Sequence, residues 1–223
     1  MAPHAPRDGE LWVEHLSWEP RAFLYHNFLS PDETAHLVAL AKPYMAKSRV
    51  VDNESGEEKP SEVRTSSGMF LQRGQDAVVA AIEARIAAHT HIPATHGEGI
   101  QVLHYAPGER YEPHFDSFHE AFNQRNGGQR IATLLMYLTD VEEGGETVFP
   151  ASTDKPNAGV AGLADCARAG VAVPPRAGDA LLFYSLTPDG RVDAKSLHGG
   201  CPVLRGDKWS ATKWMRVGPF DSA

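Results

Sequence analysis

The chain has 223 residues, of which 42% are hydrophobic, and its formal net charge is −8. This length can bury one sizeable core but not two full-sized domains, so we predict an N-terminal extension over residues 1–20 and a single domain over residues 21–223. An acidic chain lacks the concentrated basic face that nucleic acid or an anionic membrane requires, which excludes both as main partners. No apolar run approaches the roughly 20 residues that span a bilayer, and the opening residues lack the apolar segment of a signal peptide, so we expect neither element in this chain.

Two helices are predicted in the first half of the chain. The run Ser30–Glu33 is typical of a helix start, because a serine cap, a proline in the first turn and a glutamate three residues later form a capping box. Pro43 should end this helix after about Lys42. A second helix is predicted over residues 76–89, where apolar residues recur at helical spacing. We expect both helices to brace one face of a sheet.

From residue 100 onward, short alternating or apolar runs are separated by glycine and proline, which indicates β strands. The predicted strands are residues 100–105, 111–115, 131–138, 147–149, 180–184 and 209–217. The pattern is typical of a β-sandwich or jelly roll, so the fold class is α+β and mainly β. Residues 51–62 and 153–170 are polar or small and turn-rich, and loops of this length are either lids and binding loops or surface slack.

Three residues in this β region could hold one metal ion. If the chain stays extended over residues 111–116, His114 and Asp116 lie two apart and project from the same face, and His198 would join them from a later strand. Two imidazoles and one carboxylate form the facial set that holds Fe(II) and leaves three positions open. Because the chain has 11 histidines, a surface or structural role is the alternative for any one of them. His119 and His104 are rival ligands, but His119 would face the other side of the strand.

Lys208 follows His198 by ten residues and precedes the last predicted strand. A buried lysine needs an anionic partner, and a cation here suits the distal carboxylate of 2-oxoglutarate, whose keto-acid end would take two open iron positions. Thr147 and Tyr105 could share that carboxylate. The alternatives are a solvated lysine and two ordinary sheet residues. Asp116 argues against an iron halogenase, which needs a small residue at that position, so the chain is a candidate iron-dependent oxygenase.

The two cysteines, Cys166 and Cys201, leave the redox compartment open. Neither is spaced like a zinc ligand. From their number alone, a disulfide and two reduced thiols are equally compatible with the sequence.

With these residues in place, the chain resembles the prolyl 4-hydroxylases, and is nearest the plant and green-algal enzymes and the catalytic domain of the collagen type. The resemblance covers about residues 22–217. It rests on the runs Arg64–Leu71, Gln101–Asp116, Arg130–Leu138, Gly144–Pro150 and His198–Trp209.

The resemblance implies a double-stranded β-helix, or jelly roll, that uses Fe(II), 2-oxoglutarate, O2 and ascorbate. The iron ligands would be His114, Asp116 and His198. The far carboxylate of 2-oxoglutarate would lie on Lys208, with hydrogen bonds from Tyr105 and Thr147. The implied reaction is that of a procollagen-proline 4-dioxygenase, in which peptidyl proline becomes 4-hydroxyproline while 2-oxoglutarate is decarboxylated to succinate and CO2.

The implied substrates are proline-rich polypeptides, either like cell-wall glycoproteins or like collagen. Such a chain favours polyproline II, so it enters an aromatic-lined groove at little ordering cost. The resemblance implies that residues 51–62 close over this groove and that Arg64, Ser66, Tyr111 and Trp214 line it. It also implies a disulfide between Cys166 and Cys201 and a place in the secretory pathway, in the endoplasmic reticulum or Golgi. We expect a monomer.

Three other functions remain as alternatives. The first is a hydroxylase of the same chemistry that acts on another residue or on a small molecule. The second is a non-catalytic peptide-binding jelly roll, which the intact metal triad and Lys208 disfavour. The third is a zinc hydrolase, which would need a water-activating carboxylate that no motif supplies.

Overall fold

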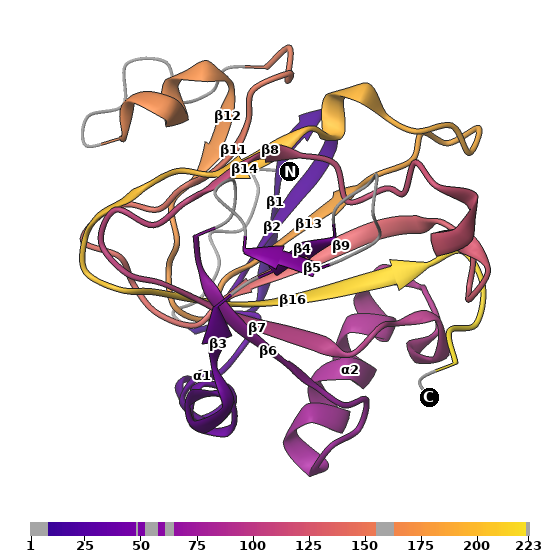
Figure 1. Ribbon diagram of the computed structural model, residues 1–223, viewed down its shortest axis with the longest axis horizontal. Helices are drawn as coiled ribbons and strands as arrows, with labels where there is room; N and C mark the ends of the chain where they lie inside the picture. The colour runs from indigo at the N-terminus through magenta and orange to yellow at the C-terminus, as the bar shows by residue number, and fades with distance from the viewer. Residues whose placement is uncertain (1–8, 48, 52–57, 61–64, 155–162, 222–223) are drawn as a thin grey trace, which may run out of the picture.

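The computed structural model describes residues 9–47, 49–51, 58–60, 65–154 and 163–221 (Figure 1). In this part of the chain, two antiparallel sheets form the body of the molecule. The eight-stranded sheet runs in the order β1 (Trp12–Trp18), β2 (Arg21–His26), β13 (Ala180–Tyr184), β9 (Arg130–Tyr137), β16 (Lys208–Arg216), β7 (Ile100–Tyr105), β6 (Ser67–Leu71) and β3 (Ala46–Lys47). The four-stranded sheet runs in the order β12 (Val171–Val173), β11 (Thr147–Phe149), β14 (His198–Gly200) and β8 (Tyr111–His114).

Shorter elements connect these sheets. Two strand pairs lie outside them, namely β10 (Glu143–Gly144) with β15 (Val203–Arg205) and β4 (Arg49–Val51) with β5 (Glu58–Pro60). Short 3-10 turns occupy Lys42–Tyr44, Ala94–His96, Ala121–Gln124, Asp165–Ala169 and Ala194–Ser196.

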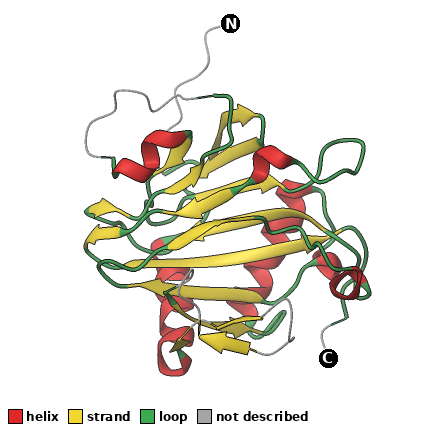
Figure 2. Cartoon of the chain, turned by 45° about the horizontal axis from the view of Figure 1, so that its top comes forward, coloured by secondary structure: helices red, strands yellow, loops and turns green. Residues whose placement is uncertain are grey.

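Two helices, α1 (Pro31–Ala41) and α2 (Ala77–Thr90), cover one face of the large sheet (Figures 1 and 2). The predicted capping box of α1 is confirmed, because Ser30 Oγ accepts from Glu33 N at 3.2 Å and Ser30 N donates to Glu33 Oε2 at 2.9 Å. Helix α2 begins after Asp76, whose side chain accepts from the backbone N–H of Val79. The helices and the sheet share one apolar core, which includes Leu37, Val79, Ile82, Ile86, Val102, Leu134, Met136 and Ala211.

The opposite face of the large sheet packs against the small sheet. Their common cluster includes Tyr137, Leu181 and Phe183 from the large sheet and Phe149, Val171 and Val173 from the small one. Strand alternation therefore gives the large sheet one face toward the helices and one toward the small sheet. The mainly β jelly roll with helices bracing one sheet, as predicted, is confirmed.

Most predicted strands agree with the structure to within one residue. The strands over 100–105, 147–149 and 180–184 have the predicted bounds, while β16 begins one residue early, at Lys208. The prediction missed every strand before residue 100, from β1 to β6, and β1 falls within the expected extension over residues 1–20. Because β1 pairs with β2 in the large sheet, the folded domain includes Trp12–Trp18. As an edge strand, β1 is mostly exposed and therefore carries a weak alternation signal.

Two features of the turn-rich segments bear on the site. Of the predicted lid over residues 51–62, the structure describes only the ends, which belong to β4 and β5 and pair antiparallel, while residues 52–57, 61 and 62 lie outside the described residues. Cys166 and Cys201 form a disulfide, as the resemblance implied, and it ties the 3-10 turn Asp165–Ala169 to the residue after β14. Among the described residues, no helix is long and apolar enough to cross a membrane.

Candidate active site

The three predicted metal ligands meet between the two sheets. His114 ends β8 and His198 begins β14, and the two residues are direct partners across the antiparallel pair. Asp116 lies in a bend just past β8, not within the strand as predicted, yet its carboxylate reaches the same point. The potential ligand atoms of the three residues all lie within 4.8 Å of one another. Asp116 Oδ1 is 3.7 Å from His114 Nε2, and Asp116 Oδ2 is 3.7 Å from His198 Nε2.

Backbone carbonyls orient both imidazoles. His114 Nδ1 lies 2.9 Å from the carbonyl oxygen of Glu112, and His198 Nδ1 lies 3.0 Å from that of Ser196. A carbonyl can only accept, so each Nδ1 carries the proton and each Nε2 carries a lone pair on the side of Asp116. This tautomer is the one that a metal-binding histidine requires.

Asp116 is held as a carboxylate. It is buried, and Thr133 Oγ1 donates a hydrogen bond to its Oδ2 at 2.6 Å. Burial alone would raise the pKa of Asp116, but His198 and His114 in their protonated forms, the charge of Arg130 and the bond from Thr133 hold this pKa below its usual range. Two oriented imidazoles and one carboxylate form the donor set that suits Fe(II), so these residues fit the metal that the sequence predicted.

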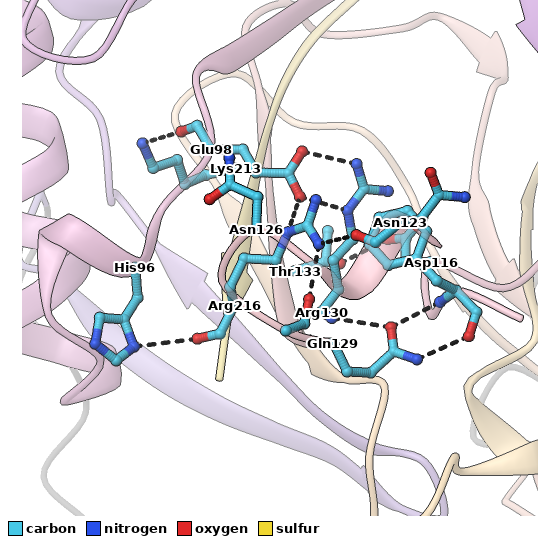
Figure 3. Close-up of polar contacts among 12 residues, drawn as sticks. His96, Glu98, Asp116, Asn123, Asn126, Gln129, Arg130, Thr133, Lys213 and Arg216 are labelled. Carbon is cyan, nitrogen blue, oxygen red and sulfur yellow. Dashed lines mark hydrogen bonds and ion pairs between the residues drawn. The ribbon is translucent and has the colours of Figure 1, made fainter. Parts of the chain in front are cut away.

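Strand β9 and its neighbours support the chain around Asp116 (Figure 3). Arg130 Nε and Nη2 donate to the two carboxylate oxygens of Glu98 at 2.7 and 2.8 Å, and Arg216 Nε donates to Glu98 Oε1 at 2.6 Å. The Arg130 guanidinium stacks on the ring of Trp214 at 3.9 Å. Gln129 bonds both backbone polar groups of Phe118, which fixes the segment that follows Asp116.

Lys208 lies at the other end of the same cavity, buried at the start of β16. Its Nζ donates to the carbonyl oxygen of Gly145 at 2.7 Å and lies 5.4 and 5.7 Å from the ring centroids of Tyr105 and Tyr137. Burial lowers the pKa of Lys208 to about 8, while the nearby charge of Glu146 acts to raise it. An ammonium has three N–H donors, so Lys208 can donate to the Gly145 carbonyl and also receive a carboxylate.

Hydroxyl groups surround this lysine. Tyr137 donates to Thr147 Oγ1 at 2.9 Å, so the Thr147 proton points elsewhere and can reach a ligand. Burial raises the pKa of Tyr137, which keeps it a neutral donor. Tyr105 lines the cavity as predicted. Tyr137 was not predicted as a site residue, although strand alternation from Thr133 places both on the cavity face.

The peptide-groove predictions have mixed outcomes. The ring of Tyr111 stacks on that of His114 at 3.6 Å, and both Tyr111 and Trp214 line the cavity. Ser66 is fully buried and is not among the lining residues. Arg64 lies outside the described residues.

The rival metal ligands are not part of the cluster. Within the described residues, the group that could hold a metal does not include His119 or His104. His119 is exposed, and His104 Nε2 pairs with Asp207 at 2.9 Å. One continuous cavity thus joins a three-residue metal centre to a buried cation, which is an arrangement for binding a metal ion together with a carboxylate-bearing chelator.

Comparison with known proteins agrees with this arrangement. The family model described as the 2OG-Fe(II) oxygenase superfamily matches residues 100–216. Probable prolyl 4-hydroxylase 3 of Arabidopsis thaliana is 60% identical over 214 residues, which cover 95% of this chain and 75% of that protein. Prolyl 4-hydroxylase 5 of the same plant is 57% identical over 215 residues, which cover 96% and 74% of the two chains.

Solved structures show the same fold. The 2OG complex of the viral collagen prolyl hydroxylase from Paramecium Bursaria Chlorella virus-1 matches with a TM-score of 0.64 at 24% identity, over 87% of this chain and 95% of that one. A Trichoplax adhaerens prolyl hydroxylase in complex with a hypoxia inducible factor peptide matches with a TM-score of 0.59 at 16% identity, over 87% and 83% of the two chains.

Proposed function

This chain belongs to the 2OG-Fe(II) oxygenase superfamily and, within it, to the prolyl 4-hydroxylases, and from this membership we propose that it hydroxylates C4 of prolyl residues in proline-rich polypeptides. One oxygen atom of O2 enters the proline and the other enters the succinate that forms, with CO2, from 2-oxoglutarate. The observation that carries the proposal is the single cavity lined by His114, Asp116 and His198 and also by Lys208.

Fe(II) would be held by the two Nε2 atoms and the Asp116 carboxylate. When bound with its cosubstrates, the metal supplies the oxidising power for C–H hydroxylation. The residues of the chain supply orientation, because the carbonyls of Glu112 and Ser196 fix the imidazoles and Thr133 fixes the carboxylate. Ascorbate would return oxidised iron to the ferrous state.

The cosubstrate would lie between the metal and Lys208. The Lys208 ammonium would bind the distal carboxylate, and Thr147 and Tyr105 would donate to the same group. Charge-assisted hydrogen bonds of this kind contribute about 1.5–3 kcal/mol each. The burial of Lys208 excludes water, which strengthens this contact.

The peptide would enter beside Tyr111 and Trp214. Both rings line the cavity, and proline-rich chains in polyproline II dock on aromatic surfaces. Among the described residues, the buried indole nitrogen of Trp214 has no hydrogen-bond partner.

The disulfide between Cys166 and Cys201 supports a place in the secretory pathway, because disulfides persist in oxidising compartments.

We propose that the protein is a monomer. Equilibrium sedimentation of the purified protein tests this assembly, and a concentration-dependent dimer would contradict it.

The direct test measures succinate release with Fe(II), 2-oxoglutarate and ascorbate, with and without a polyproline peptide, and reads the peptide by mass spectrometry. Peptide-stimulated succinate and a one-oxygen mass gain on proline are expected. An equal rate of succinate release with and without the peptide would indicate that the enzyme acts on another substrate. Peptide binding without any turnover would make the chain a binding module.

A further inference from the structure

A second groove opens beside the catalytic cavity, at the end of the large sheet where β6 and β7 meet the C-terminal segment. It is lined by Phe70, Leu71, Gln72, Arg73, Glu98, Gly99 and Phe220. Its volume of about 390 Å³ lies within the range of roughly 300–1,000 Å³ that is typical of ligand sites. None of the residues described so far as metal or cosubstrate site lines it.

Phe70 connects this groove to the catalytic cavity. On β6, Leu71 and Met69 pack toward the helices, so alternation places Phe70 on the face of the sheet that carries the cavity. Its ring centroid lies 6.3 Å from that of Trp214, at an interplanar angle of 39°. Since Trp214 lines the cavity and Phe70 lines the groove, the two aromatic rings form one continuous surface.

The aromatic surface is held rigidly from below. Arg130 stacks on Trp214, and Arg216 stacks on Phe220 at 5.2 Å from its ring centroid. Glu98 joins these two arginines through the bonds shown in Figure 3 and itself lines the groove. Because its carboxylate is paired with both arginines, all three side chains are held in place, and a docked chain would not have to order the rings.

Phe70 is 54% exposed, so its ring is accessible to a docked chain. The pyrrolidine rings of a polyproline II chain pack on aromatic side chains, and here the exposed ring of Phe70 lies against the buried ring of Trp214 at the edge of the cavity. That helix has three residues per turn and rises about 3.1 Å per residue, so successive prolines on one side lie about 9 Å apart. A chain whose target proline lies in the cavity would therefore place a further turn over Phe70.

We propose that Phe70 and Phe220, with Trp214, form a distal docking groove that binds the residues of a proline-rich substrate about one turn or more from the target proline. The inference rests on the proposed function for the identity of the chain that docks. It adds a length requirement, because only a peptide long enough to leave the cavity reaches Phe70. Short peptides would depend on the cavity alone.

The test compares polyproline peptides of increasing length, from about four to about sixteen residues, with the Fe(II)- and 2-oxoglutarate-loaded protein under anaerobic conditions. Calorimetry measures the dissociation constant of each peptide without turnover. The dissociation constant should fall with length in the unmodified protein. In Phe70→Ala it should rise about tenfold for the long peptides, the effect of removing one anchor side chain, while the shortest peptide binds as before.

Two further variants make the test specific. Tyr44→Ala removes an aromatic side chain that is 71% exposed after α1, on the helix side of the molecule, and should leave the whole length series unchanged. Phe70→Tyr keeps the ring and should restore long-peptide affinity. Thermal unfolding of Phe70→Ala should match that of the unmodified protein, because the ring is mostly exposed.

Three other results would contradict the proposed docking groove. Equal weakening of short and long peptides by Phe70→Ala would place Phe70 in the cavity, and unchanged binding would remove it from the substrate path. Absence of length dependence in the unmodified protein would also exclude a distal site. If peptides bind with the predicted length dependence but proline gains no oxygen under turnover conditions, the proposed function fails and the docking groove stands.

Discussion

The two faces of the large sheet are built from the same strands but are stabilised by different forces. On β9, Leu134 and Met136 pack toward the helices, whereas Thr133 lines the catalytic cavity and Tyr137 packs against the small sheet. The helix face is mostly apolar, so burial at about 25 cal/mol per Å² stabilises it, and its buried ion pair joins Lys213 of β16 to Glu83 of α2. The cavity face combines apolar side chains such as Leu135 and Phe183 with buried polar ones such as Thr133, whose hydrogen bonds depend on precise geometry.

This difference separates stability from function within single strands. Substitutions on the helix face should lower the free energy of unfolding while the site keeps its geometry. Substitutions on the cavity face should abolish binding while the fold persists, since buried polar groups at a site cost stability that their function requires. Four experiments test how completely the two faces are separated.

The largest effect should come from Asp116→Ala. Removing the carboxylate deletes a direct metal ligand, and even indirect supports of such ligands cost about 10–100-fold, so turnover should fall more than about a hundredfold. Metal analysis of the dialysed protein should show lost iron. His119→Ala is the matched control and should retain iron and most activity. Near-full activity of Asp116→Ala would remove the metal assignment.

Leu134→Ala probes the helix face of the same strand. Leu134 is 1% exposed, and a buried leucine truncated to alanine costs about 3 kcal/mol of unfolding free energy. Urea denaturation measures this loss, and kcat/KM well below the unfolding temperature should stay within about twofold. Leu204→Ala, at a site that is 51% exposed, should be nearly neutral. A large loss of kcat/KM in folded Leu134→Ala would show that the two faces are coupled.

Lys208→Met should weaken ligand binding while largely preserving stability, which is the opposite of the effect expected for Leu134→Ala. Loss of a charge-assisted bond of about 2 kcal/mol would raise the dissociation constant for 2-oxoglutarate about thirtyfold. The free energy of unfolding without ligand should change little, because the desolvation cost of the buried ammonium is removed while the buried Glu146 carboxylate loses a nearby positive charge. Calorimetry and urea denaturation measure the two quantities. Lys195→Met, which changes a lysine outside the cavity, should leave 2-oxoglutarate binding intact.

The smallest effect is a pH dependence at the same residue. Burial lowers the pKa of Lys208 to about 8, and only the protonated ammonium binds a carboxylate, so 2-oxoglutarate affinity must fall as pH rises through this value. Between pH 7 and 8.5 the dissociation constant should rise about fourfold. Burial moves the pKa of Tyr137 upward, away from this window. Lys208→Met should show no such rise, and an equal rise in that variant would assign the titration elsewhere.

The sequence alone identified those site residues whose side-chain type is itself specific for a metal ion or a carboxylate. The His114, Asp116 and His198 set and Lys208 could be found from residue identity and spacing, and the structure brings all of them to one cavity. The supports were not found, because Thr133, Tyr137 and Arg130 look like ordinary strand residues until the register between strands is known. Edge strand β1 was missed for a related reason, since its few buried positions leave little alternation to detect.

Strand β16 fixes the distance between the proposed cosubstrate site and the proposed peptide site. This one strand supplies four residues of the cavity lining, namely Lys208, Ser210, Thr212 and Trp214. Lys208, proposed to bind the cosubstrate, and Trp214, proposed to bind the peptide, therefore belong to the same strand. Six residues at about 3.3 Å each separate these two ends by about 20 Å. The reach between the bound carboxylate and the incoming polypeptide is therefore set by strand length, which loop motion cannot alter.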